Sequence, residues 1–269
     1  MSKTPHKYVI TSGWWCGPPG DEIRKRLGSE RIRQVDFFDQ WKNSIQHNTS
    51  PLKVMVLDSA SPITPTKDQL KGIEFISINS NPGHSTKHTG KYSGYMRSII
   101  MGVTYASVCD ADYWVYVEQD ALLKGKGIIE HCIHNMKTPY MFGSGEGTPQ
   151  FLQQSFIIIR KDGYEKFLAK LNKIKAKDKV ISPETKFLLA TSPIYNLIPN
   201  FMLAQIERDS LIGKVLKKLI NLSLPYLKGY DILPVGFGRT RPIHFQKEYF
   251  YFQHGSEDEL NKYFQALGR

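Results

Sequence analysis

The feature that most limits the fold of this chain is a series of short segments that contain consecutive apolar residues rather than an alternating pattern. They fall at residues 7–15, 53–62, 75–79 and 113–117, where VMVL and YWVYV are the clearest cases. A strand of a parallel sheet is buried on both faces, so apolar residues follow one another along it. Segments with helical spacing separate these strands, as over residues 91–108. This alternation predicts an α/β fold with a mostly parallel, Rossmann-type sheet and helices on both faces.

The second half of the chain has a less regular pattern. A Gly-rich stretch at 141–150 predicts a loop, and SFIIIR at 155–160 predicts a strand followed by a Lys-rich helix. Short strands are expected within 231–254. A closing helix should begin at SEDEL, because Ser256 and Glu259 have the spacing of a capping box. The C-terminal part is therefore expected to consist of short strands and a helix.

Three of the four predicted strands in the first half end in small or polar residues. They are Thr11, Ser12 and Gly13 in the first strand, Asp58 in the second, and Glu118, Gln119 and Asp120 at the end of the fourth. In open parallel sheets, ligands bind beyond the carboxyl ends of the strands. These residues therefore predict a binding edge.

Glu118 and Asp120 are two carboxylates at that edge. Residues two apart in an extended strand project from the same face, so both carboxylates should point the same way. Their repulsion is relieved by a divalent cation such as Mg²⁺ or Mn²⁺, which takes one or two protein carboxylates and completes its shell with phosphate oxygens and water. The alternative is a structural role, in which the acid pair caps a neighbouring helix.

The composition indicates a globular protein with anionic partners. Hydrophobic residues make up 41% of the 269 residues, and the net charge is +11. This excess favours nucleotides or phosphorylated substrates; nucleic acid is disfavoured, because carboxylates at the binding edge would repel its phosphates. We expect a cytoplasmic protein with reduced thiols, since its three cysteines share no metal-site spacing and neither a signal peptide nor a spanning apolar run is apparent.

Two adjoining motifs carry a resemblance to a known family. The first, NPGHSTKHTGKYSGYMRSIIMGVTYA, runs from an Asn- and Gly-containing loop into a helix with Arg97, and the second, DADYWVYVEQD, ends in acid-x-acid. This order resembles the GT-A-type glycosyltransferases, most closely their large inverting group (family 2), where the strand ends in Asp-x-Asp. Here Glu-Gln-Asp keeps the final metal-binding residue as Asp120. The resemblance covers residues 7–125 well, and it implies one continuous GT-A domain with a nucleotide-sugar-binding half (1–125) and an acceptor-binding half (126–269).

The resemblance also implies roles for the residues at the binding edge. A nucleotide-sugar donor, with a UDP-sugar as the best candidate, would meet Thr11, Ser12, Gly13, Asp58, Arg97, Glu118 and Gln119. Asp58 would touch the base or ribose, although it could instead cap a turn. Arg97 would face the nucleotide or brace the loop before its helix, although it could instead be a surface residue. The acceptor would be a saccharide or a lipid-linked saccharide.

The metal and the catalytic base follow from the same resemblance. A Mn²⁺ or Mg²⁺ ion would be held by Asp120, Glu118 and His254, because a histidine near the end of the domain often completes such a site; His244, in PIHF, is expected inside a strand instead. The general base that takes the proton of the acceptor hydroxyl would be Glu184 at a helix start. Glu146 in the Gly-rich loop is the competing candidate, and Glu184 could simply complement the helix dipole.

Two other functions remain open. A nucleotidyltransferase that makes nucleotide sugars would normally carry a Gly-rich loop with basic residues directly after the first strand, and SGWWCGPPG has no basic residue. A catalytically inactive sugar-binding module is the non-enzymatic alternative.

Residues 210–227 predict a basic amphipathic helix. One helical face would hold the apolar residues Leu211, Ile212, Val215, Leu216, Leu219 and Ile220, and the other would hold most of the lysines. Such a helix can lie in a membrane interface, which would place the protein peripherally on the cytoplasmic face of a membrane. Alternatively, its apolar face packs on the domain core.

Overall fold

The computed structural model describes residues 6–18, 27–83, 88–206 and 210–267. The strands of the main sheet are β1 (Tyr8–Trp14), β2 (Lys53–Asp58), β3 (Glu74–Ser77), β4 (Tyr113–Val117), β6 (Tyr140–Ser144), β7 (Leu152–Arg160) and β8 (Asp231–Ile232). A smaller sheet contains β5 (Ala121–Lys124), β9 (Phe237–Gly238) and β10 (Phe250–Gln253). The α-helices are α1 (Phe37–Asn48), α2 (Gly94–Val108), α3 (Ile128–His134), α4 (Tyr164–Lys173), α5 (Pro183–Thr191), α6 (Asn200–Ile206), α7 (Leu211–Leu227) and α8 (Glu257–Ala266). Short 3-10 helices are η1 (Glu30–Arg33), η2 (Lys161–Gly163) and η3 (Tyr195–Leu197).

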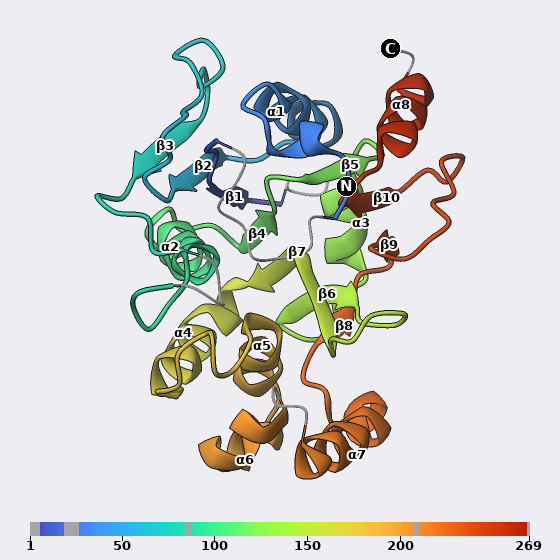
Figure 1. The fold of residues 1–269 in the computed structure, drawn as a ribbon. Helices are drawn as coiled ribbons and strands as arrows, with labels where there is room; N and C mark the ends of the chain where they lie inside the picture. The colour runs from blue at the N-terminus through green and yellow to red at the C-terminus, as the bar shows by residue number, and fades with distance from the viewer. Residues whose placement is uncertain (1–5, 19–26, 84–87, 207–209, 268–269) are drawn as a thin grey trace.

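The main sheet has the strand order β3-β2-β1-β4-β7-β6-β8. Strands β3, β2, β1 and β4 run parallel to one another, β7 is antiparallel to both β4 and β6, and β8 is parallel to β6. The predicted α/β fold with a mostly parallel sheet is therefore confirmed. Figure 1 shows that the sheet forms the centre of the molecule, with helices packed on it.

Helices cover both faces of the main sheet, as the sequence predicts. On one face, α2, α4 and α5 pack on a core that includes Trp114 and Tyr116 of β4. On the other face, α1 and α3 pack on alternate residues of the same strand, Val115 and Val117. Each side chain of β4 thus meets one of two apolar cores, which is why its sequence is apolar throughout.

The smaller sheet and α8 form a third apolar core. Phe250 and Phe252 of β10 pack there against Leu260 and Tyr263 of α8. The predicted capping box of α8 is present, since the Ser256 hydroxyl accepts from the backbone N–H of Glu259 and the Glu259 carboxylate accepts from the backbone N–H of Ser256. This arrangement brings the end of β10 close to the end of β4, where the candidate site lies.

Two sequence predictions for the second half were wrong in part. The stretch 141–150 is not all loop, because β6 extends to Ser144 and its apolar residues are buried beside β7. No strand forms at PIHF, where Pro242 has no N–H group to contribute to a strand ladder, and His244 is exposed rather than interior.

Candidate active site

The candidate site lies where the order of the parallel strands reverses. Strand β1 pairs with β2 on one side and with β4 on the other. The chain runs from β1 outward through β2 and β3 and then returns to form β4 on the opposite side of β1. Crevices at such switch points, beyond the carboxyl ends of the strands, are the usual ligand sites of open α/β sheets. Here the two carboxyl ends carry Gly13–Trp14 and Glu118–Asp120.

A glutamine bridges the two carboxylates after β4. The Nε2 atom of Gln253 donates to Glu118 Oε2 at 2.5 Å and to Asp120 Oδ1 at 3.1 Å. Gln253 is the last residue of β10, and its antiparallel pairing with Ala121 of β5 fixes it beside the acids. The amide thus occupies the place between the carboxylates where the sequence predicted a cation.

Glu118 has an unusually high pKa at this place. Burial and the neighbouring charge of Asp120 raise the pKa of Glu118 to about 8, against the opposing effects of Arg239 and the Gln253 hydrogen bond. A proton on Glu118 near neutral pH removes much of the repulsion between the two acids.

Asp120 also lies close to His254, the third predicted metal ligand. His254 Nε2 lies 3.4 Å from Asp120 Oδ2, and both side chains are mostly buried. Burial lowers the pKa of His254, which favours the neutral imidazole that binds metals. Its Nδ1 atom is buried without a hydrogen-bond partner in the described part of the chain.

Asp120 and His254, two of the three predicted ligands, present donor atoms that suit a divalent cation. A carboxylate oxygen and an imidazole nitrogen suit Mn²⁺, and the other positions could be taken by phosphate and water. Across the described residues, no group of three His, Cys, Asp or Glu side chains is arranged to hold a metal ion by itself. Glu118 is held instead by Gln253.

Glu184 lines a small hollow next to Glu118 and Asp120, which we call the acid cluster. The hollow is also lined by Gln153, Gln154, Arg239 and Gln253. The charge of Glu184 is one of the effects that raise the pKa of Glu118, so the two carboxyl groups are electrostatically close. Glu184 is 8% exposed in the first turn of α5.

The competing base candidate lies elsewhere. Glu146 is exposed in the turn that follows β6, where its backbone N–H donates to the Ser144 hydroxyl. It does not line the hollow. Of the two glutamates singled out from the sequence, the structure brings only Glu184 to the acid cluster.

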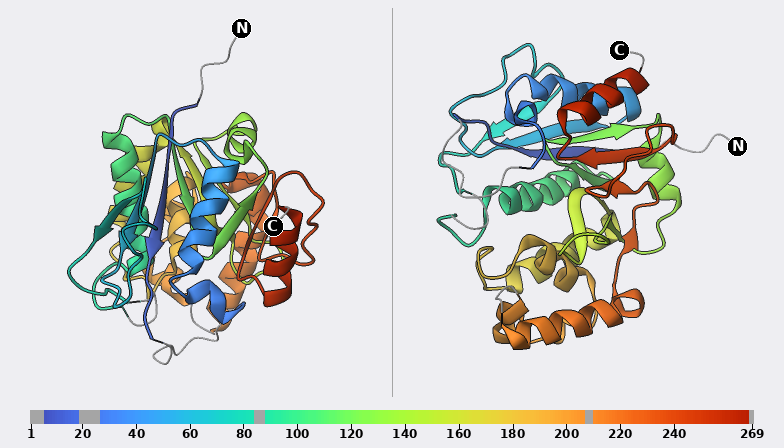
Figure 2. Two further views of the ribbon diagram at one scale, coloured as in Figure 1. Left: turned by 90° about the horizontal axis from the view of Figure 1, so that it is seen from above. Right: turned by 45° about the vertical axis from the view of Figure 1, so that its right-hand side comes forward.

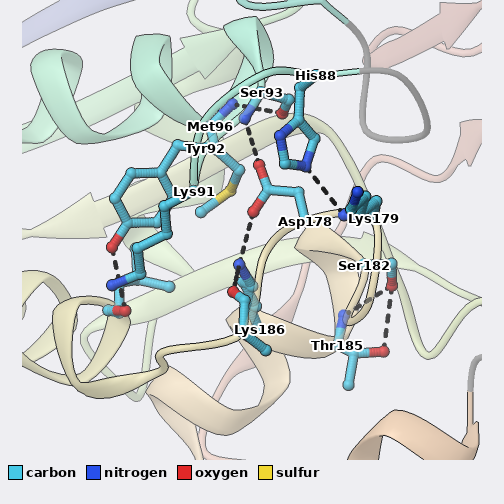
Figure 3. Close-up of polar contacts among 12 residues, drawn as sticks. His88, Lys91, Tyr92, Ser93, Met96, Asp178, Lys179, Ser182, Thr185 and Lys186 are labelled. Carbon is cyan, nitrogen blue, oxygen red and sulfur yellow. Dashed lines mark hydrogen bonds and ion pairs between the residues drawn. The ribbon is translucent and has the colours of Figure 1, made fainter.

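A buried polar network fixes the start of α5, which carries Glu184 (Figure 3). Lys186 Nζ lies 2.6 Å from Asp178 Oδ1 and donates to the carbonyl oxygen of Ala176 at 2.7 Å, and the Lys186 and Asp178 side chains are fully buried. Asp178 Oδ2 also accepts from the backbone N–H of Ser93, the N-cap of α2, at 2.6 Å. The network therefore joins the first turns of α2 and α5.

The residues at the end of β1 face inward. Thr11 is fully buried, and its hydroxyl accepts from Trp114 Nε1 at 2.8 Å. Ser12 is also buried, and its hydroxyl donates to the carbonyl oxygen of Gly13. Only Gly13 of the three is partly exposed, with its N–H donating to the Tyr116 hydroxyl.

Asp58 and Gln119 make internal hydrogen bonds. The fully buried carboxylate of Asp58 accepts from the N–H and hydroxyl of Ser61 and from the Ser77 hydroxyl. It therefore closes the turn after β2, as the alternative interpretation of the sequence supposed. The side-chain amide of Gln119 pairs with the backbone N–H and C=O of Trp15, which ties the end of β4 to the segment after β1.

Arg97 lies on α2 and contacts the preceding loop. Its Nε atom donates to the carbonyl oxygen of Tyr92 at 3.2 Å. This contact matches the bracing of the loop that was one of the expected roles of Arg97.

Sequence reasoning missed Arg239 and Gln253. Arg239 lines the hollow, and its backbone N–H donates to Gln153 Oε1 at 2.9 Å. The charge of its guanidinium lowers the pKa of both Glu118 and His254. A partial signal for it was present, because GFGRTRP places two arginines directly after a Gly-containing strand. Gln253 had no such signal, since it is 135 positions from Glu118 along the chain.

Comparisons with known proteins give only distant similarities. No protein-family model matches the chain, and no curated protein sequence is similar to it. Among solved structures, the chain is similar to S. aureus TarS in complex with UDP, with a TM-score of 0.45, 11% identity, and coverage of 97% of this chain and 64% of TarS. An active-site mutant of LgtC gives a TM-score of 0.45 at 9% identity, with coverage of 97% of this chain and 95% of LgtC.

A third similar structure contains a metal. It is the mannosyltransferase PcManGT from Pyrobaculum calidifontis in complex with GDP-Man and Mn²⁺, with a TM-score of 0.40, 9% identity, and coverage of 69% of this chain and 50% of that protein. The chain thus spans between half and two thirds of the length of PcManGT and TarS. Likeness at these scores carries no argument about activity.

Proposed function

We propose that this chain is a metal-dependent glycosyltransferase that acts in surface glycan synthesis. It would move a sugar, with inversion, from a nucleotide-diphosphate sugar to a saccharide or a lipid-linked saccharide. One observation carries the proposal: at the switch point of the sheet, the Asp120–His254 pair adjoins a hollow lined by Arg239 and Glu184. These groups would supply a cation site, a fixed positive charge and a candidate base in one place.

The donor would bind with its diphosphate at the ends of β1 and β4, and a UDP-sugar is the best candidate. Asp120 and His254 would hold Mn²⁺ or Mg²⁺, which neutralises the negative charge that develops on the diphosphate as it leaves. Arg239 would add a guanidinium, which suits phosphate oxygens. Residues 1–125 would form the donor half, and 126–269 the acceptor half.

Glu184 would act as the general base. It would accept the proton of the acceptor hydroxyl while that oxygen forms a bond to the anomeric carbon, and the electron pair of the broken C–O bond would leave with the diphosphate. Glu184 lies in the first turn of a buried helix and lines the hollow, which would let the helix position its carboxylate there. The proton on Glu118 would keep the adjoining acid cluster from repelling the diphosphate.

A panel of nucleotide sugars with Mn²⁺ tests this proposal. We expect release of the nucleoside diphosphate from one UDP-, GDP- or dTDP-sugar, abolished by EDTA and by Asp120→Asn. The matched control is Asp68→Asn, which alters an exposed aspartate far from the cluster and should retain the activity. Release of pyrophosphate from a nucleoside triphosphate and a sugar phosphate would instead indicate a nucleotidyltransferase, and binding without turnover would indicate a sugar-binding module.

We also infer a cytoplasmic location with peripheral attachment to the membrane through residues 210–227. Every helix within the described ranges is too short or too polar to cross a bilayer. A peripheral position would let the protein meet a lipid-linked acceptor from the cytoplasmic side.

A further inference from the structure

Helix α7 lies at the periphery of the molecule and exposes an apolar surface. Figures 1 and 2 show α6 and α7 as an outer layer on the side of the sheet away from α1 and α8. The sequence suggested two alternatives for α7, a helix packed on the core or one that lies in a membrane interface. The structure shows that the helix has an apolar face for the core and a second apolar face that remains exposed.

The face toward the protein is formed by residues about one helical turn apart. Gly213 and Ile220 are buried, and Leu216, Leu224 and Leu227 pack against the core at the edge of that face. Tyr195 supports the contact, because its hydroxyl is 2.7 Å from that of Ser223. Leu216 and Ile220, predicted to share the membrane-facing side, therefore belong to the packed side.

The other apolar face is continuous and exposed. It consists of six side chains, between 52% and 86% exposed, which we call the α7 stripe: Leu211, Ile212, Val215, Leu219, Leu222 and Tyr226. At about 100° per residue, these positions fall within about 100° of the helix circumference, and they extend over roughly 22 Å of helix. Leu197 of η3 and Phe201 of α6 add two more exposed apolar side chains in the same outer layer.

The charged side chains on α7 itself are all positive. Residues 210–230 contain four lysines and no Asp or Glu. On the helix, Lys214 and Lys218 are exposed along one margin of the stripe. An apolar stripe with lysines at its margin matches a surface that is apolar below and negatively charged above, and this combination occurs at an anionic lipid bilayer.

We propose that the α7 stripe docks on an anionic lipid membrane. Its apolar side chains enter the boundary between head groups and acyl chains, and Lys214 and Lys218 lie at the level of the anionic head groups. This assignment deepens the peripheral attachment in the proposed function and rests on the exposure and charge of α7; failure of the vesicle test would leave the proposed glycosyl transfer unaffected. It defines which face of the protein is turned toward the membrane.

Sedimentation with lipid vesicles tests the proposal. Two compositions are compared at low salt: phosphatidylcholine alone, and phosphatidylcholine with about one third phosphatidylglycerol. We expect the wild-type protein to sediment with the anionic vesicles and to bind the neutral ones at least about tenfold more weakly. A wild-type protein that stays in the supernatant with both kinds of vesicle overturns the proposal.

Two pairs of variants separate the apolar and the electrostatic contributions. Leu219→Gln with Leu222→Gln should reduce binding to anionic vesicles at least about tenfold, because both side chains are exposed and neither contributes to the core. Lys214→Glu with Lys218→Glu should produce a similar loss. The matched controls are Leu52→Gln with Val108→Gln, and Lys67→Glu with Lys126→Glu, which change equally exposed residues on other elements.

The controls also define the contrary results. Equal losses in the control variants would show that binding depends on overall hydrophobicity or charge rather than on the α7 stripe, and would refute the proposal. A lipid-free wild-type dimer that becomes a monomer in the Leu219/Leu222 variant would show that a second copy of the chain covers the stripe, and would refute it as well.

Discussion

Replacing Lys186 with Met is expected to destabilise the folded protein strongly. The Lys186 and Asp178 side chains are fully buried, with Nζ and Oδ1 2.6 Å apart. Removal of the ammonium group leaves a buried carboxylate that retains the hydrogen bond from the Ser93 N–H but loses its countercharge. Breaking a buried ion pair in this way costs about 3–5 kcal/mol of unfolding free energy.

Guanidinium chloride unfolding measures this loss against a surface ion pair. The control is Lys161→Met, because Lys161 lies 2.7 Å from Asp112 but both side chains are exposed, at 67% and 37%. Loss of that pair should cost no more than about 1 kcal/mol. In the double variant Asp178→Asn/Lys186→Met, the destabilisation should be smaller than the sum of the two single effects, since no unpaired charge remains. A cost for Lys186→Met as small as that for Lys161→Met would refute the reasoning.

Three further predictions concern the active site and the packing beneath it. Glu184→Gln should lower the turnover of sugar transfer about 10²–10⁴-fold with little change in donor affinity, as measured by steady-state kinetics, whereas Glu146→Gln should leave turnover near the wild-type value. Arg239→Ala should weaken UDP binding in calorimetry by at least about tenfold, since a charge-assisted hydrogen bond contributes about 1.5–3 kcal/mol, and unchanged affinity would remove Arg239 from the donor site. Gly102→Ala should destabilise the fold by about 1–3 kcal/mol in thermal unfolding, because a Cβ atom there would lie 2.4 Å from the Thr11 hydroxyl of β1. Its control, Thr104→Ala on the exposed side of the same helix, should be nearly neutral.

Local sequence patterns were sufficient to predict much of the fold. The strands around 53–58 and 113–117 were predictable because burial on both faces selects the consecutive apolar residues VMVL and YWVYV. The start of α8 was predictable because its cap is made by residues three apart. Helix α1 was not predicted, although its residues Phe38, Trp41 and Ile45 form an apolar face. Strand β6 was obscured because glycines follow it directly.

The arrangement of the site was harder to predict because its contacts join distant parts of the chain. The sequence predicted two carboxylates on one face at the end of a strand. The group that lies between them is the side-chain amide of Gln253 from β10. Its position depends on the pairing of β10 with β5, which the sequence does not show. The role of Asp58 was also difficult to predict from the sequence. A polar residue at a strand end suggested ligand contact, whereas hydrogen bonds from Ser61 and Ser77 use its carboxylate internally.

Binding of Mn²⁺ in the presence of UDP tests the central claim most directly. Equilibrium dialysis should show that the wild-type protein binds Mn²⁺ together with UDP, and that Asp120→Asn weakens this binding at least about tenfold. Glu118→Gln should have a smaller effect, because Glu118 is held by Gln253 and burial raises the pKa of its carboxyl. Equal Mn²⁺ binding by the wild-type protein and the Asp120→Asn variant would contradict the account.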